Sequence, residues 1–147
     1  MTSSTVNKTF CIKKPLNFNC KSQKYADIEY ISKSGRHFVI EAKSHYSKDR
    51  DNGVHKLFGE LLKETGRRSR SDVLGVLLTD GSRKGRKIFY REKFHLINKN
   101  AYLAFGKLVR CRYVFLLNVE TQEIRLFSWS GFYRGDKERG RLSCLDQ

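Results

Sequence analysis

The stretch that decides the fold runs from Arg36 to Lys43 and reads RHFVIEAK. Its β-branched and aromatic residues predict a β-strand. A strand points successive side chains to opposite faces, so Glu41 and Lys43 share one face while Ala42 points toward a core. The plain interpretation is a solvated charge pair on the open face of an antiparallel sheet, because an acid-any-base triplet alone is common.

The residues before this strand predict a β-hairpin. The turn is Lys33-Ser34-Gly35, and Gly35 supplies the positive φ that a three-residue loop needs at its last position. This loop length sets the cross-strand pairs Ile31 with His37, Glu29 with Val39, and Asp27 with Glu41. A two-residue turn would instead move Asp27 to the opposite face of the sheet.

Two carboxylates that face each other across a strand pair repel, so we expect a cation between them. Lys43 supplies part of that charge, and a divalent metal supplies it more naturally. Oxygen ligands of this kind suit Mg²⁺ or Mn²⁺. The pair Asp27 and Glu41 therefore predicts a metal site.

The chain after the triplet predicts a helix and then a buried strand. Apolar residues at Val54, Leu57, Phe58, Leu61 and Leu62 follow helical spacing. Asp51 or Asn52 is the expected N-cap, and Gly66 the expected residue after the C-cap. The apolar run 73–79 reads as a central strand buried on both faces. The order predicts a right-handed βαβ unit joined to an antiparallel hairpin, hence an α/β fold with a mixed central sheet and flanking helices.

This order of elements, with Asp27 before Glu41-Ala42-Lys43, resembles the PD-(D/E)xK nuclease superfamily over residues 25–80. The resemblance implies a restriction-endonuclease-like core and a Mg²⁺- or Mn²⁺-dependent endonuclease. It implies that Asp27, Glu41 and the backbone carbonyl of Ala42 bind the metal and that Lys43 is catalytic. Glu60 lies where many relatives carry a polar helix residue near the site, although it also fits a solvated helix flank. Ala26 stands where the namesake proline often occurs.

The chemistry of these residues suits phosphodiester hydrolysis. A divalent ion can activate water, compensate charge at phosphorus and assist the leaving oxygen. An ammonium group at Lys43 would orient the attacking water and neutralise developing charge on the phosphate. A metal-dependent deoxyribonuclease is the predicted activity.

A formal net charge of +15 over 147 residues predicts a polyanionic partner, with DNA as the expected nucleic acid and RNA as the alternative. Two basic clusters flank the buried strand, and they provide the candidate nucleic-acid contacts Arg67, Arg68, Arg70, Arg83, Lys84, Arg86 and Lys87. One domain presents one site, so cutting both strands would require a homodimer or two sequential nicks.

The rest of the chain sets the context. The four cysteines lack paired CxxC spacing, and no secretory or membrane-spanning stretch is visible, so we expect a cytoplasmic or nucleoid-associated protein. Residues 100–109 predict a helix, and 112–119 and 124–129 predict a strand pair. The length fits a single domain, 1–147, with residues 131–147 as a flexible basic tail.

Two other functions remain open at this point. The fold could be a non-catalytic nucleic-acid-binding module whose acidic pair is structural. Alternatively, the chain could be a protein-interaction subunit whose basic surface meets an acidic partner.

Overall fold

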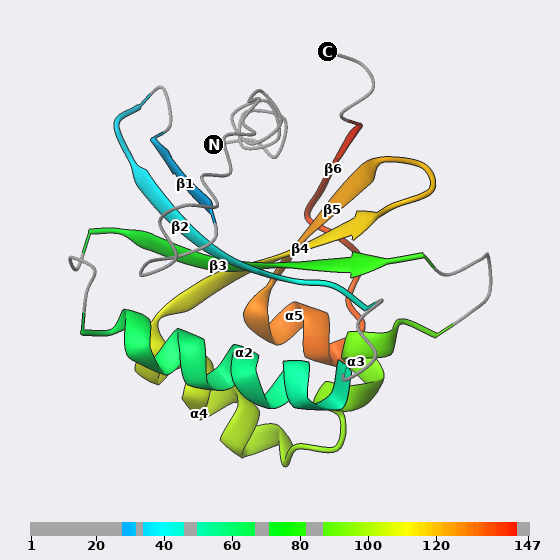
Figure 1. Ribbon diagram of the computed structural model, residues 1–147, viewed down its shortest axis with the longest axis horizontal. Helices are drawn as coiled ribbons and strands as arrows, with labels where there is room; N and C mark the ends of the chain where they lie inside the picture. The colour runs from blue at the N-terminus through cyan, green and yellow to red at the C-terminus, as the bar shows by residue number, and fades with distance from the viewer. Residues whose placement is uncertain (1–27, 32–33, 46–49, 67–70, 82–86, 144–147) are drawn as a thin grey trace.

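The computed structural model describes residues 28–31, 34–45, 50–66, 71–81 and 87–143. These residues form a mixed α/β structure in which one six-stranded sheet carries its helices on one face (Figure 1). The predicted mixed sheet with flanking helices is therefore confirmed. The right-handed sense of the crossover stays a prediction.

The strands follow one another across the sheet in chain order. They are β1 (Ile28–Ile31), β2 (His37–Lys43), β3 (Val73–Asp80), β4 (Cys111–Asn118), β5 (Glu123–Ser128) and β6 (Gly140–Ser143). The pairs β2–β3 and β3–β4 are parallel, and the other neighbours are antiparallel. The carboxyl ends of β2, β3 and β4 therefore lie at one edge of the sheet.

The hairpin has the predicted register over its described part. Ile31 pairs with His37, and Glu29 pairs with Val39. Gly35 adopts a φ of +88°, the left-handed conformation that the three-residue loop requires. The turn chemistry therefore predicts the pairing correctly.

The helices are α2 (Arg50–Glu64), α3 (Phe89–Phe94), α4 (Lys99–Val109) and α5 (Trp129–Arg134). The predicted amphipathic helix is α2, and its predicted N-cap is wrong. The helix is already formed at Arg50, so Asp51 lies in its first turn. The predicted end is confirmed in position, because Glu64 is the last helical residue and Gly66 follows the C-cap. Gly66 donates to the Lys63 carbonyl without the positive φ of a left-handed cap.

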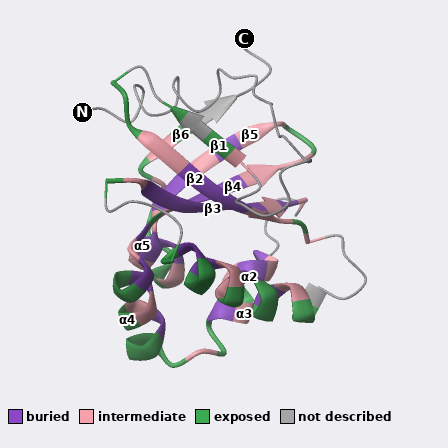
Figure 2. Cartoon of the chain, turned by 60° about the vertical axis from the view of Figure 1, so that its left-hand side comes forward, coloured by how far each residue is buried: buried purple, intermediate pink, exposed green. Residues whose placement is uncertain are grey.

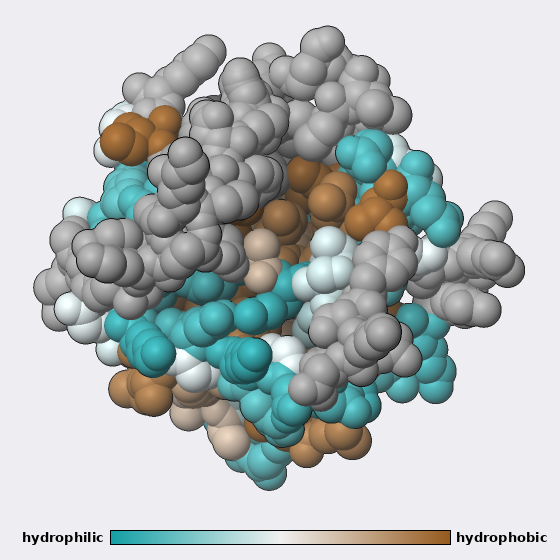
Figure 3. Space-filling view, in the orientation of Figure 1, coloured by the Kyte–Doolittle hydropathy of each residue, from teal (hydrophilic) through white to brown (hydrophobic). Residues whose placement is uncertain are grey.

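One side chain on α2 also departs from the predicted apolar face. Leu62 is 50% exposed, whereas Glu64 is buried. The apolar stripe of the helix therefore narrows toward its end. The solvent side of α2 belongs to a mostly hydrophilic band in the space-filling view (Figure 3).

The main core lies between the helices and the sheet. Strand β3 is buried along almost its whole length, as its apolar run predicts (Figure 2). Its residues Leu74, Val76 and Leu78 pack in the helix-covered cluster, whereas Leu77 belongs to a smaller cluster on the opposite face. Because successive side chains of β3 point to opposite faces of the sheet, this strand contributes to both hydrophobic clusters.

The segment after Gly131 differs from the predicted flexible tail. Its residues form most of α5 and the edge strand β6, with residues 144–147 outside the described part of the chain. Phe132 is fully buried against Phe94 and Phe127, with ring centroids 5.7 and 5.4 Å apart. Tyr133 adds a second aromatic contact, because its hydroxyl donates to the Ile97 carbonyl at 2.8 Å. The polar composition of the segment conceals these two aromatic anchors, which hold it on the core.

No helix in the described part of the chain is long and apolar enough to cross a membrane.

Candidate functional site

The Glu-Ala-Lys triplet lies at the carboxyl end of β2, on the edge where the parallel strands finish. Val39 packs in the helix-covered cluster, whereas Ile40 and Ala42 pack on the opposite face. Alternation therefore places Glu41 and Lys43 on the face that the helices cover. Glu41 is only 3% exposed, so its carboxylate lies in a setting from which water is largely excluded.

Helix α2 brings a second carboxylate to this face. Glu60 Oε1 lies 2.9 Å from Lys43 Nζ. The oxygen is shielded from solvent, although the Glu60 side chain as a whole is 40% exposed. Glu60 Oε1 takes part in this ion pair, and no described group makes a well-aligned hydrogen bond to the same oxygen. A partly exposed pair of this kind contributes at most about 1 kcal/mol to stability, so its interest lies in where it holds the ammonium group.

The two residues after Lys43 are fixed by neighbouring elements. The Tyr90 hydroxyl donates to the Ser44 carbonyl at 2.8 Å, and burial raises the pKa of Tyr90 to about 12. The His45 backbone N–H donates to Thr79 Oγ1 at 2.9 Å, and His45 Nδ1 lies 2.5 Å from the same oxygen. The end of β2 is thus anchored to β3 and α3, which limits the freedom of Lys43.

A further buried carboxylate lies at this edge of the sheet. Asp80 closes β3, is 5% exposed and shares the face of Leu78. Burial and the nearby Arg125 lower the pKa of Arg91, and the charge of Asp80 offsets part of this decrease. Arg91 Nε also donates to the Phe132 carbonyl at 2.6 Å. An acidic residue that ends an apolar strand is the signal that would have marked Asp80.

Several predicted site residues lie outside the described part of the chain. They are Asp27 and the basic residues Arg67, Arg68, Arg70, Arg83, Lys84 and Arg86. Lys87 is described and exposed, and it directly precedes the buried Ile88. Of the predicted set, the structure places Glu41 and Lys43 on one face of β2 and pairs Lys43 with Glu60.

The described residues do not by themselves form a group of metal ligands. Among them, no group of three or more His, Cys, Asp or Glu side chains could hold an ion. Glu41 and the Ala42 carbonyl are hard oxygen donors, and Mg²⁺ commonly takes one or two carboxylates together with waters and substrate phosphates. These two groups fit Mg²⁺ as two of three protein ligands. The third ligand would be a second carboxylate.

Comparison of the chain with protein-family models, curated proteins and solved structures gave no match in any of the three.

Proposed function

We propose that the protein is a metal-dependent endonuclease that hydrolyses DNA phosphodiester bonds, with a restriction-endonuclease-like core. The order of elements supports this fold. An antiparallel hairpin leads into helix α2, which leads into the buried strand β3 parallel to β2. The conclusion about activity rests on the side chains of this unit, because a fold alone does not define a function.

One observation carries the proposal. The buried Glu41 and Lys43 share one face of β2 at the end of the parallel strands, and the Glu60 carboxylate forms an ion pair with Lys43 there. A carboxylate with 3% exposure is a hard oxygen donor in a setting with little water, which suits the binding of a divalent ion.

The proposed ligand set is Asp27, Glu41 and the Ala42 carbonyl, with Mg²⁺ or Mn²⁺ as the ion. The pairing of Glu29 with Val39 supports the inclusion of Asp27. The same register predicts that Asp27 faces Glu41 across the two strands. The bound ion would supply charge compensation at the phosphate. Lys43 would hold the attacking water by hydrogen bonding, and Glu60 would fix the direction of the ammonium group.

The net charge of +15 supports a nucleic acid as the substrate, and we propose DNA. The experiment incubates the purified chain with labelled duplex DNA, single-stranded DNA and structured RNA, in Mg²⁺, Mn²⁺ or EDTA. The test variants are Lys43→Ala and Glu41→Gln. The matched control is Lys63→Ala, which removes the same charge from the exposed end of α2.

We expect cleavage of DNA in Mg²⁺ or Mn²⁺ that EDTA stops, that both test variants lose and that Lys63→Ala retains. Cleavage of RNA alone would keep the mechanism and change the substrate. Tight binding without cleavage in any metal would instead identify a non-catalytic nucleic-acid-binding module. We retain the non-catalytic binding module as the second function because the described residues supply an incomplete ligand set.

A further inference from the structure

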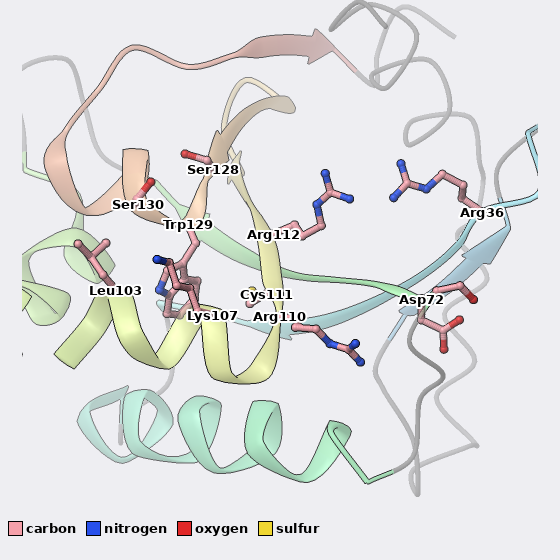
Figure 4. Close-up of a pocket in the computed structure, with 12 residues that line it drawn as sticks. Arg36, Asp72, Leu103, Lys107, Arg110, Cys111, Arg112, Ser128, Trp129 and Ser130 are labelled. Carbon is pink, nitrogen blue, oxygen red and sulfur yellow. The ribbon is translucent and has the colours of Figure 1, made fainter. Parts of the chain in front are cut away.

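A basic groove lies at the amino-terminal ends of the parallel strands, whereas Glu41 and Lys43 lie at the carboxyl end of β2. It has a volume of about 780 Å³ and is lined by side chains from the starts of β2 and β4 and from the ends of α4 and β5. Its charged lining residues are Arg36, Asp72, Lys107, Arg110 and Arg112. In the close-up of the groove, Arg36 and Arg112 extend toward one another, and Arg110 extends toward Asp72 (Figure 4).

The charge of this groove is strongly one-sided. None of the described carboxylates forms an ion pair with Lys107, Arg110 or Arg112. The one acidic lining residue, Asp72, already contacts His37 Nδ1 at 3.0 Å. Four cationic side chains that gather at an open groove create a positive potential that attracts anions.

The backbone at Arg110 provides an independent sign that this charge has a use. Arg110 is the C-cap of α4 and adopts a left-handed conformation, with φ of 57° and ψ of 42°. Glycine and asparagine are the residues that favour this position, because a side chain with a Cβ is strained there. A strained residue other than glycine persists where its side chain serves another purpose.

The floor of the groove is closely packed. Gly106 lies directly under Trp129, and a Cβ added at Gly106 would come within 2.2 Å of Trp129 Cδ1. Trp129 Nε1 donates to the Tyr102 carbonyl, and the Tyr102 hydroxyl donates to the Trp129 carbonyl, both at 2.9 Å. The cationic side chains therefore stand on a preorganised base, which lowers the entropy cost of binding.

We propose that this groove is a nucleic-acid contact that binds backbone phosphates, separate from the candidate catalytic site. The cations come from different elements around an open groove, which suits a chain of phosphates better than a single phosphate group. Arginine is suited to this task because its planar guanidinium group binds phosphate oxygens in a bidentate manner. The proposal does not depend on nuclease activity, since it involves neither Glu41 nor a metal.

A structural role for the same charges must be separated from binding. Lys107 and Arg110 lie at the carboxyl end of α4, where cations stabilise the helix dipole. A purely structural role predicts that their removal lowers stability and leaves affinity for DNA unchanged. A binding role predicts the reverse.

The experiment measures binding of labelled duplex DNA by fluorescence anisotropy, in EDTA so that no cleavage occurs, at several salt concentrations. The test variants are Lys107→Gln, Arg110→Gly and Arg112→Gln. The matched control is Lys99→Gln, which removes the same charge from the exposed first residue of the same helix. Thermal unfolding of every variant is measured in parallel.

We expect each test variant to weaken DNA binding roughly 3- to 10-fold at low salt, and to reduce the slope of log affinity against log salt by about 1. Lys99→Gln should change affinity less than about twofold, because it removes only long-range charge. Arg110→Gly should keep or raise the unfolding temperature while it weakens binding, because glycine relieves the strained φ.

Equal binding by the groove variants and Lys99→Gln would overturn the proposal. Polyglutamate provides the second comparison. If it binds as tightly as DNA and loses as much affinity in the same variants, the groove is a docking surface for an acidic protein and the proposal fails. The assay contains EDTA and measures binding alone, so a failed nuclease test leaves the result of this experiment unaffected.

Discussion

His37 Nδ1 lies 3.0 Å from Asp72 Oδ1, and this contact joins the first residue of β2 to the residue that precedes β3. The other ring nitrogen, Nε2, lies 3.0 Å from Glu29 Oε1 on β1. One imidazole therefore connects three neighbouring strands at the edge of the sheet. A ring between two carboxylates is stabilised in its protonated form.

The contacts of His37 predict a pH dependence of stability. Partial burial lowers the pKa of His37, but Asp72 and Glu29 together raise it further, so the net shift is upward from 6.5. A raised pKa in the folded state means that this stabilisation is fully present below pH 6.5 and is lost as the pH rises through the folded pKa. We expect His37→Gln to remove this component from the unfolding temperature measured between about pH 5.5 and 8.5.

The control for this prediction is His55→Gln, which removes an exposed histidine from α2. The exposed fraction of the His37 side chain is 35%, so solvent screening keeps the effect small. A pH profile that His37→Gln leaves unchanged would show that the two contacts do not form in solution.

Two glycine-to-alanine substitutions should change stability in opposite directions. In Gly106→Ala the new methyl group would overlap Trp129, since its Cβ would lie 2.2 Å from Cδ1. Overpacking of this kind costs about 1–3 kcal/mol or more. In Gly59→Ala the Cβ on α2 would meet nothing within 4 Å, so the helix should gain about 0.5–1 kcal/mol.

Urea denaturation of both glycine variants measures these changes directly. If Gly106→Ala is as stable as the unmodified protein, Trp129 does not pack against α4 in the way that the structure shows. Gly59→Ala reports whether helix propensity alone accounts for either result.

The local parts of the fold were predictable from sequence because their signals are local. Gly35 specifies its own turn conformation and, with it, the register of the hairpin. The apolar run of β3 marks a strand buried on both faces. By contrast, Phe132 is held by Phe94 and Phe127, and the charged stretch that begins at Arg134 conceals these contacts. The order in the last part of the chain depends on this tertiary packing, which composition does not reveal.

The candidate site also combines features that local sequence predicts with features that depend on tertiary packing. Alternation along β2 predicts that Glu41 and Lys43 share a face, and the structure places them so. The contact between Lys43 and Glu60 depends on how α2 packs on the sheet, which spacing alone does not determine. The groove around Arg110 and Arg112 could not be predicted from sequence patterns, because its lining residues come from separate elements.

Glu60 should act by positioning Lys43 rather than by contacting substrate. If the protein is a nuclease, Glu60→Ala should slow cleavage by roughly 100-fold, because a misplaced catalytic group costs about that much. Glu60→Gln keeps an oxygen acceptor for the ammonium group, so it should recover about tenfold of that loss. Single-turnover cleavage rates at saturating metal measure both effects.

Glu92→Ala is the control for Glu60, since it removes an exposed carboxylate from the nearby helix α3. Equal activity of Glu60→Ala and Glu60→Gln would contradict the positioning role, because partial rescue by the amide is its specific signature. Normal activity in both variants would mean that the pair is only a surface contact.

Metal binding can be tested without any substrate. A ligand that binds only the folded state stabilises it by about 2.7 kcal/mol at a concentration 100 times its dissociation constant. We expect Mn²⁺ to raise the unfolding temperature of the protein and EDTA to reverse the increase. Glu41→Gln and Asp27→Asn should each abolish the shift, because each removes one carboxylate of the proposed ligand pair. The control Glu120→Gln removes an exposed carboxylate from the turn between β4 and β5 and should retain it. An increase that Glu41→Gln keeps in full would place the metal elsewhere on the protein and remove the chemical basis of the proposed activity.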